Sequence, residues 1–296
     1  MKHLVSCLIA VLCISSTGLG QTDQVYRASQ EENHVFGKIN AISIIHIHAE
    51  QTNINIIQWD KPFVDMVILN TSSHEKEEVA RAGLDRVKFH KDEIGKNLYI
   101  RKLVTAGQNN GGEVPRIFSE LTMMVPGGVE FRLKNKVGRI TVESGNIDLN
   151  GILELCQLIV TRSSINLNVS QSFGEVKISD SQIRGELKLN RVNATLSQVQ
   201  GSLKANTRWG SLVIDPTQSS LELTASIDKT EMSVRGLSLE KYQLDINSKS
   251  SRINVSPALL LDFAETETGK TLSHFPANPS VKLNIESDNS EINLQN

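Results

Sequence analysis

The stretch from Gly174 to Pro216 constrains the fold most, because it repeats a short unit in which a glycine precedes alternating apolar and polar residues. Units begin at Gly174, Gly185 and Gly201, and a related unit begins at Trp209. Successive side chains of a β-strand point to opposite faces, so each unit has one apolar face. A single unit is too small to bury that face, which predicts a stack of β-rungs.

The same alternation begins near Val129 and runs to Val255, and it resumes from Val281 to Leu294. The apolar residues Ile165, Val176 and Leu187 are 11 positions apart (176 − 165 and 187 − 176), whereas other units are more closely spaced, so the spacing predicts no fixed rung length. We predict an all-β fold, a single-chain β-solenoid over residues 126–296 with an insertion at 257–280. We also expect the polar residues 287–291 to form a turn that caps its C-terminal end.

Residues 35–125 predict a β-rich N-terminal segment that carries one short helix. The helix is expected within residues 72–86, because Val79, Ala80 and Leu84 fall on one helical face. Two strand-like runs on either side of Gly95 predict a hairpin.

The start of the chain, residues 1–34, has the features of an export signal and a leader. Lys2 precedes a short apolar run, and Gly18 and Gly20 are small residues suited to cleavage before Gln21, which predicts a signal peptide over residues 1–20. Lipidation at Cys7 or Cys13 stays open as an alternative. Residues 21–34 are polar and predict a flexible leader, and the chain after residue 20 shows no apolar run long enough for a transmembrane segment. The chain is therefore expected to be exported to the periplasm, to the outer surface or into the medium.

Composition excludes several classes of function. The 296 residues carry a formal net charge of −2, and a nucleic-acid partner would require clustered positive charge, so none is expected. Hydrophobic residues make up 39% of the chain, enough for a folded core. After cleavage Cys156 is the only cysteine, and its apolar neighbours predict a small buried side chain rather than a reactive thiol.

Three segments carry a family resemblance: Ile56–Asp60, Leu121–Pro126, and the Gly-x-Ile-x-Val units from Gly138 onward. With them the chain resembles the adhesin-type β-helix proteins of bacterial envelopes, the head-domain or DUF4097-like group. The resemblance spans most of the chain after residue 20 and implies an exported, non-catalytic β-solenoid. The chain departs from that group by having Arg, Asn, Glu or Ser after glycine where Asp is frequent.

One metal-ligand pattern stands out. His46, His48 and Glu50 alternate along a predicted strand, so their side chains share one face and two imidazoles and a carboxylate are available to a metal ion. The alternative is an ordinary half-exposed strand face. The sequence offers no further ligand, and we predict no metal and no cofactor.

Two further sets of residues bear on function. A polysaccharide lyase or hydrolase on the solenoid surface is the enzymatic alternative, with Asp148, Glu175, Asp180 and Arg184 as its charged groups. For a binding protein the candidates are Trp209, at a predicted rung corner, and the polar residues Asn166 and Lys188. We expect a non-catalytic envelope protein, adhesin-like or structural, whose partner is a glycan or an envelope protein.

Overall fold

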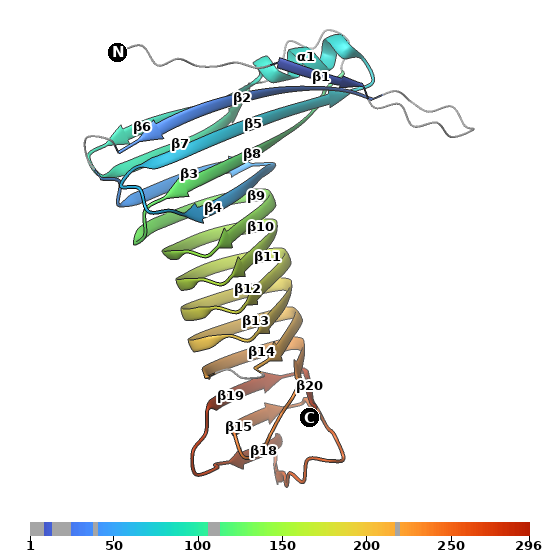
Figure 1. Ribbon diagram of the computed structural model, residues 1–296. Helices are drawn as coiled ribbons and strands as arrows, with labels where there is room; N and C mark the ends of the chain where they lie inside the picture. The colour runs from blue at the N-terminus through green and yellow to red at the C-terminus, as the bar shows by residue number, and fades with distance from the viewer. Residues whose placement is uncertain (1–8, 14–24, 38–40, 106–112, 217–219) are drawn as a thin grey trace. The chain divides into compact units, whose positions relative to one another are not determined.

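The computed structural model describes residues 9–13, 25–37, 41–105, 113–216 and 220–296 (Figure 1). The chain divides into two compact units, Met1–Gly138 and Arg139–Asn296. The regular secondary structure of the described residues is β-strand except for one α-helix, α1 (Glu77–Asp85), which confirms the all-β prediction. No helix in these ranges is both long and apolar enough to cross a bilayer.

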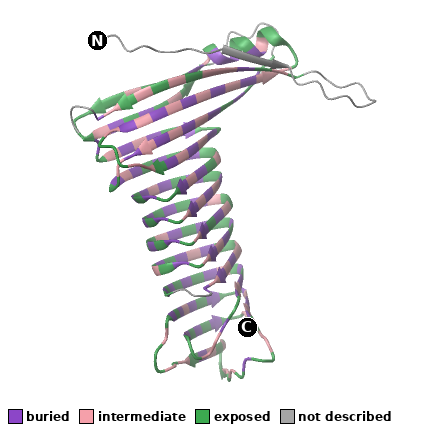
Figure 2. Cartoon of the chain, in the orientation of Figure 1, coloured by how far each residue is buried: buried purple, intermediate pink, exposed green. Residues whose placement is uncertain are grey.

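The first unit contains two groups of paired strands. One group pairs in the order β1 (Ile9–Cys13), β2 (Tyr26–Phe36), β5 (Val64–His74), β8 (Arg116–Val125) and β4 (Thr52–Gln58). The other pairs in the order β6 (Val87–Ile94), β7 (Asn97–Val104), β3 (Ile44–Glu50) and β9 (Val129–Glu143). Alternate residues of these strands are buried, including Ile47, Ile100 and Met66, so each group presents one face to a core and the other to water (Figure 2).

One sequence prediction for this unit needs correction. The flexible leader predicted for 21–34 is in part strand β2, whose backbone pairs with β5 from Tyr26 to Phe36. Tertiary pairing overrides local propensity there. The short helix predicted within 72–86 is confirmed as α1, which begins at Glu77 because Ser72 and Ser73 extend β5 and pair with both β2 and β8. The predicted hairpin is confirmed as β6 and β7, with Gly95 at its turn. Residues 1–8 and 14–20 of the predicted signal lie outside the described residues.

The second unit is the β-solenoid that the sequence predicts. Its successive rungs are β10 (Asn146–Thr161), β11 (Ser164–Ser179), β12 (Gln182–Ser197), β13 (Gln200–Asp215) and β14 (Leu221–Val234), and each pairs in parallel with the next. Ile147 pairs with Ile165 and Ile165 with Ile183, so equivalent positions of these rungs differ by 18 in number (165 − 147 and 183 − 165). The coil of rungs is visible in Figure 1.

Each of the rungs β10, β11 and β12 has two corners, where a non-glycine residue adopts positive φ. Within β10 the first corner is Leu155 (φ 53°), and the second is Arg162 (φ 50°), just after the strand. The buried positions change parity at both corners, from Leu153 to Cys156 and from Val160 to Ser163. The apparent spacing of 11 from Ile165 to Val176 (176 − 165) therefore joins the two arms of one rung.

Glycines follow the first corner in alternate rungs, at Gly174 in β11 and Gly210 in β13. At Gly174 φ is 106°, and a β-carbon there would collide with the carbonyl oxygen of Cys156 in the previous rung. Glycine alone tolerates both this positive φ and this close approach of the two backbones.

Serine hydroxyls close the second corner. Ser163 Oγ accepts the N–H of Gly145 (3.1 Å), and Ser181 Oγ accepts the N–H of Ser163 (3.1 Å). Each hydroxyl also donates within its own rung, Ser163 to Thr161 O at 2.8 Å and Ser181 to Ser179 O at 2.6 Å. These bonds link neighbouring rungs where the backbone ladder is interrupted.

The C-terminal rungs do not follow sequence order. The strands β19 (Val281–Asp288) and β20 (Glu291–Leu294) pair in parallel with β14 on one side. On the other side β19 pairs with β15 (Tyr242–Lys249) and β20 with β16 (Arg252–Val255). The last segment of the chain is therefore inserted between two rungs formed earlier in the sequence.

The end of the stack is covered by the predicted insertion. It contains the strands β17 (Ala264–Thr266) and β18 (Gly269–His274), and β18 runs antiparallel along β15. The cap predicted at 287–291 is wrong, because Asn289 (φ 47°) is a corner between β19 and β20. The hairpin pairs the backbone edge that β15 would otherwise expose.

Candidate functional site

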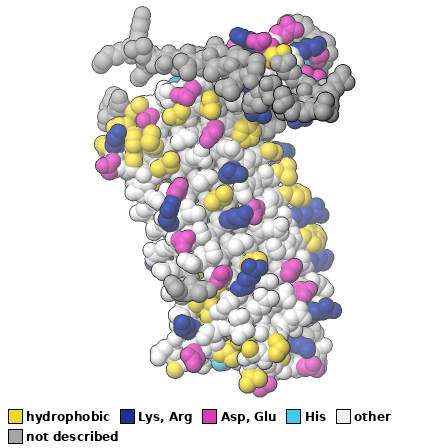
Figure 3. Space-filling model, turned by 45° about the vertical axis from the view of Figure 1, so that its right-hand side comes forward, with side chains coloured by type: hydrophobic (Ala, Val, Ile, Leu, Met, Phe, Trp, Pro, Cys, Tyr) yellow, Lys and Arg dark blue, Asp and Glu magenta, His cyan; other side chains and the backbone are white. Residues whose placement is uncertain are grey.

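The first corners of successive rungs place a column of large side chains in solvent. Its members occupy the same point of the rungs β10 to β13, and all have positive φ: Leu155, Phe173, Arg191 and Trp209. In β14 the same point holds Lys229 (φ 49°). The side chains of Leu155, Phe173 and Trp209 are 49, 38 and 36% exposed. We call these four residues the corner column. Figure 3 shows hydrophobic side chains beside Lys and Arg side chains along one edge of the coil.

Cationic side chains cover the rings of this column. The guanidinium of Arg191 lies 5.4 Å from the ring centre of Phe173 and 5.2 Å from that of Trp209. Arg208 lies 4.0 Å and Lys229 5.4 Å from the Trp209 ring. Each such contact contributes about 0.5–1 kcal/mol when exposed, so the rings and the cations order one another.

The second corners differ in chemistry. Their positive-φ residues are polar or charged: Ser144, Arg162, Asp180 and Gln198. Both corners therefore bear the same backbone conformation, whereas only the first exposes apolar and aromatic surface. Turning the chain does not require that surface.

A hollow of about 560 Å³ lies beside the corner column, lined among others by Ile152, Phe173 and Lys188. The buried amide of Gln171 also lines it. Gln171 Nε2 donates to Cys156 O at 2.7 Å, and its Oε1 has no hydrogen-bond partner among the described residues. The hollow thus combines exposed apolar atoms with polar groups, as ligand-binding surfaces do.

The three predicted binding residues lie apart. Trp209 occupies a corner, as expected, but cations cover its ring. Lys188 lines the hollow and pairs with Glu186 at 3.2 Å, an interaction that holds the pKa of Glu186 below its usual value. Asn166 donates to the carboxylate of Asp148 in the preceding rung. Only Trp209 and Lys188 therefore lie in or next to the apolar surface.

The predicted enzymatic residues do not converge. Asp148 lies in the first arm of its rung, Glu175 in the second arm and Asp180 at a second corner. Glu175 pairs with Lys177 at 2.7 Å, and this bond lowers its pKa. Arg184 lies in the same ladder as Asp148, two rungs away. A glycosidase needs two carboxylates on either side of one bond, which this placement does not provide.

The residues of the predicted metal pattern share one exposed strand face, as expected, but do not form a cluster. His46 stacks on Tyr99 with ring centres 4.4 Å apart, and its Nε2 lies 3.4 Å from Asn97 Oδ1. His48 and Glu50 are exposed on the same face of β3. Among the described residues, no group of three or more His, Cys, Asp and Glu side chains is placed to hold a metal ion.

Sequence reasoning missed Leu155, Phe173 and Arg191. They could have been found from their spacing, because these three residues and Trp209 follow one another at equal intervals in the sequence. Cys156 is buried, as predicted, next to the first of these corners.

Several solved structures are similar to this chain at low sequence identity. No protein-family model and no curated protein matches this sequence. A candidate lipid binding protein from Parabacteroides distasonis is 14% identical with a TM-score of 0.47, over 89% of this chain and 96% of that one. A candidate adhesin from Bacteroides fragilis is 12% identical with a TM-score of 0.36, over the same shares of the two chains. A candidate cell adhesion protein from Clostridium sporogenes is 10% identical with a TM-score of 0.24, over 90% and 99%. The roles in these descriptions belong to the compared proteins.

Proposed function

We propose that this chain is an exported, non-catalytic binding protein of the bacterial envelope. It engages a glycan or an envelope protein through the corner column, in the manner of an adhesin. The observation that supports this proposal is the column itself: Leu155, Phe173, Arg191 and Trp209 recur at one corner and remain exposed.

The chemistry of the column favours binding over a purely structural role. Burying apolar surface stabilises a protein by about 25 cal/mol for each Å², and an apolar side chain that stays exposed does not gain this stabilisation. Tryptophan and arginine are also the residues that most often dominate binding interfaces. The second corners have the same backbone conformation with polar residues. The turn itself therefore does not explain why the first corners carry apolar and aromatic side chains.

The test compares the two corners. Phe173→Ser combined with Trp209→Ser should weaken binding of the purified protein to isolated envelopes or to its ligand on a glycan array by roughly tenfold or more. Arg162→Ser combined with Gln198→Ser at the second corner is the matched control and should bind as the unchanged protein does. Equal binding by both variants would overturn the proposal.

Two further measurements separate the remaining alternatives. Protease treatment of the envelopes should abolish binding if the partner is a protein and preserve it if the partner is a glycan. Release of shorter products during long incubation with the bound glycan would contradict the non-catalytic part of the proposal.

A further inference from the structure

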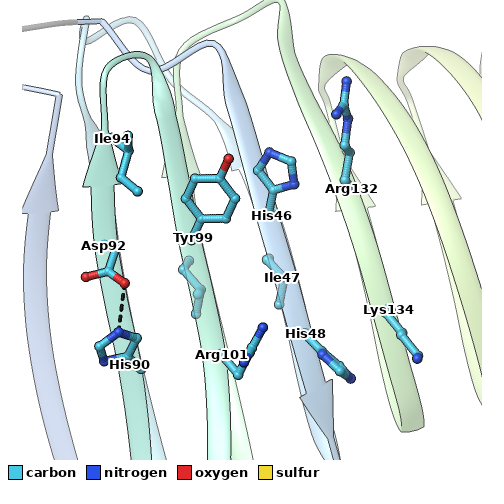
Figure 4. Close-up of a pocket in the computed structure, with 11 residues that line it drawn as sticks. His46, Ile47, His48, His90, Asp92, Ile94, Tyr99, Arg101, Arg132 and Lys134 are labelled. Atoms are coloured by element: carbon cyan, nitrogen blue, oxygen red, sulfur yellow. Dashed lines mark ion pairs between the residues drawn. The ribbon is translucent and has the colours of Figure 1, made fainter.

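A second surface, on the first unit, has a different chemistry from the corner column. The strands β6, β7, β3 and β9 lie side by side, and their exposed residues line up across the strands. One row across the four strands consists of basic side chains: His90, Arg101, His48 and Lys134. We call these four residues the basic row. Their side chains lie on one face of the sheet in Figure 4.

The basic row concentrates positive charge. Neighbouring strands are about 4.8 Å apart, so the four groups occur at roughly that interval. Arg101 and Lys134 are the two fixed charges of the row, and the strand of His48 lies between them. Neither forms an ion pair within the described ranges. Both charges are therefore available to an anionic ligand.

The adjacent row adds an aromatic surface and hydrogen-bonding groups. It consists of Asp92, Tyr99, His46 and Arg132 in the same strand order. The Tyr99 and His46 rings are stacked at an interplanar angle of 10°. The charged groups at the two ends of this row are paired: Asp92 with His90 at 2.7 Å, and Arg132 with Glu130 at 2.7 Å.

Both rows line one open hollow of about 550 Å³. Ile94, 64% exposed, adds an apolar edge to it. Figure 4 shows Tyr99 and His46 at its centre, with Arg132 and Lys134 on one side of them. The hollow therefore combines cations, a carboxylate, a phenol and ring surface within four strands.

We infer that this hollow binds an acidic glycan, one whose sugars carry carboxylate or sulfate groups. The cations of the basic row meet the acid groups, and the Tyr99–His46 pair lies against a sugar ring. Sugar hydroxyls donate to the carboxylate of Asp92, which lines the hollow. A polyphosphate chain lacks such donors along its backbone, and this carboxylate would repel it. Glu50 and Lys136 lie nearby, opposite each other on β3 and β9, and add one acidic and one basic side chain.

The inference concerns the first unit alone and is independent of the corner column. The probes are polygalacturonate oligosaccharides, which carry carboxylates, heparin oligosaccharides, which also carry sulfates, and neutral dextran. We expect the full chain to bind one or both acidic probes, more weakly as salt is raised, and not to bind dextran. Binding to neither acidic probe would overturn the inference.

Variants locate the site. Arg101→Gln combined with Lys134→Gln should weaken the Kd for the acidic probe by roughly tenfold or more, since each change removes a charge-assisted contact. The matched control is Arg81→Gln combined with Arg116→Gln, which removes the same charge from exposed positions elsewhere in the unit. Equal loss in both pairs would mean general charge attraction and would overturn the assignment.

Two more measurements identify the kind of contact that the ligand makes with this hollow. Tyr99→Leu should weaken glycan binding roughly tenfold without changing its salt dependence, because it removes ring surface and no charge. Tighter binding to a single-stranded oligonucleotide or to phosphatidylglycerol vesicles than to either acidic glycan would replace the inference with a phosphate partner. Phe173→Ser with Trp209→Ser should leave acidic-glycan binding at this hollow unchanged, so this test and that of the corner column can fail separately.

Discussion

Gly174 illustrates how closely the rungs approach one another. Its backbone has φ of 106°, and a β-carbon would meet the carbonyl oxygen of Cys156. Gly151 is a useful contrast, since its φ is ordinary and an added β-carbon would lie 3.4 Å from the Val169 side chain. The two glycines therefore serve different purposes within one solenoid.

We predict that Gly174→Ala lowers the free energy of unfolding of the second unit by about 2 kcal/mol or more. Positive φ costs a non-glycine residue of order 1–3 kcal/mol, and the collision with Cys156 O adds to it. Gly151→Ala should change stability by less than about 1 kcal/mol. Urea unfolding followed by circular dichroism measures both. Similar losses in the two variants would argue against close approach as the reason for glycine at 174.

Lys102 is a titratable group of the first unit whose pKa is strongly lowered by its environment. Its Nζ donates to the carbonyl oxygens of Glu50 (2.8 Å) and Gln51 (3.0 Å) at the turn between β3 and β4. Burial lowers the pKa of Lys102 to about 8, against about 10.4 in an unfolded chain. At neutral pH the ammonium of Lys102 is charged, and its two hydrogen bonds stabilise the turn between β3 and β4.

The lowered pKa predicts a pH dependence of stability. Between about pH 8 and 10.4 the unfolded chain holds a proton that the folded chain has released, so unfolding becomes less favourable as pH rises. Lys102→Met should lack this increase, which we expect to be about 1–2 kcal/mol after allowance for solvent screening. Urea unfolding at pH 7.5 and pH 10, followed by Trp59 fluorescence in a Trp209→Phe background, measures the difference. Lys88→Met, at an exposed site, is the control; if Lys102→Met matched its pH profile, the effect would be absent.

At the scale of elements, the hairpin of β17 and β18 protects the last rung. Its strand β18 pairs antiparallel with β15 from Leu244 to Lys249. The other side of β15 is already occupied by β19. An unpaired edge strand is a template for a second chain, so the hairpin blocks association at this end of the stack.

We predict that replacing residues 264–274 by a Gly-Ser loop makes the protein associate as its concentration rises. The replacement exposes the N–H and C=O groups of β15, which can pair with the same edge of another molecule. Light scattering after size-exclusion chromatography measures the mass. Ser273→Ala, which removes only the 3.2 Å bond to Asp245, should stay the size of the unchanged protein. A monomeric loop variant at all concentrations would contradict this role.

Much of this element-scale structure could be predicted from sequence. Alternation of apolar residues identifies strands and their buried faces, because strand periodicity does not depend on distant partners. The rung length could not be obtained in the same way, since each corner shifts the parity, as between Leu153 and Cys156. The insertion at 257–280 was visible as a break in the pattern, but its pairing with β15 depends on contacts distant in sequence.

The candidate sites were less predictable. His46 and His48 were identified because they alternate on one strand, but their neighbours Arg101 and Lys134 come from other strands. Only strand register brings those side chains into one row. Likewise, Trp209 was conspicuous by itself, whereas Leu155 and Phe173 become members of a column only when the length of the rung is known.

At the scale of the whole molecule, the order of the rungs makes the segment 281–294 essential to the solenoid. In most solenoids the last repeat contacts only the one before it, so removing it costs a single interface. Here β19 and β20 lie between β14 and the rung formed by β15 and β16. The segment 281–294 thus contributes two interfaces, and this part of the solenoid is complete only when that segment is in place.

We predict that ending the chain at Ser280 opens the solenoid internally. Both β14 and β15 then lose a parallel partner along their length, and apolar residues such as Leu223 and Leu244 lose the side chains stacked between them. Amide exchange in β14 and β15 should accelerate by roughly a hundredfold or more, an opening free energy lower by about 3 kcal/mol. The loop replacement at 264–274 should leave β14 protected, because it removes only an outer strand.

A peptide of residues 281–296 added to the shortened chain tests the same geometry from the other direction. It should restore protection of β14 and β15, since it supplies the missing strand pairs and the buried side chains of Val281, Leu283 and Ile285. The same peptide with Ile285→Asp should fail, because it would bury an unpaired charge at a position that is 1% exposed. If the amides of β14 and β15 stayed protected in the shortened chain without any peptide, these two strands would be pairing with each other. The inserted order of the rungs would then not determine the stability of this end.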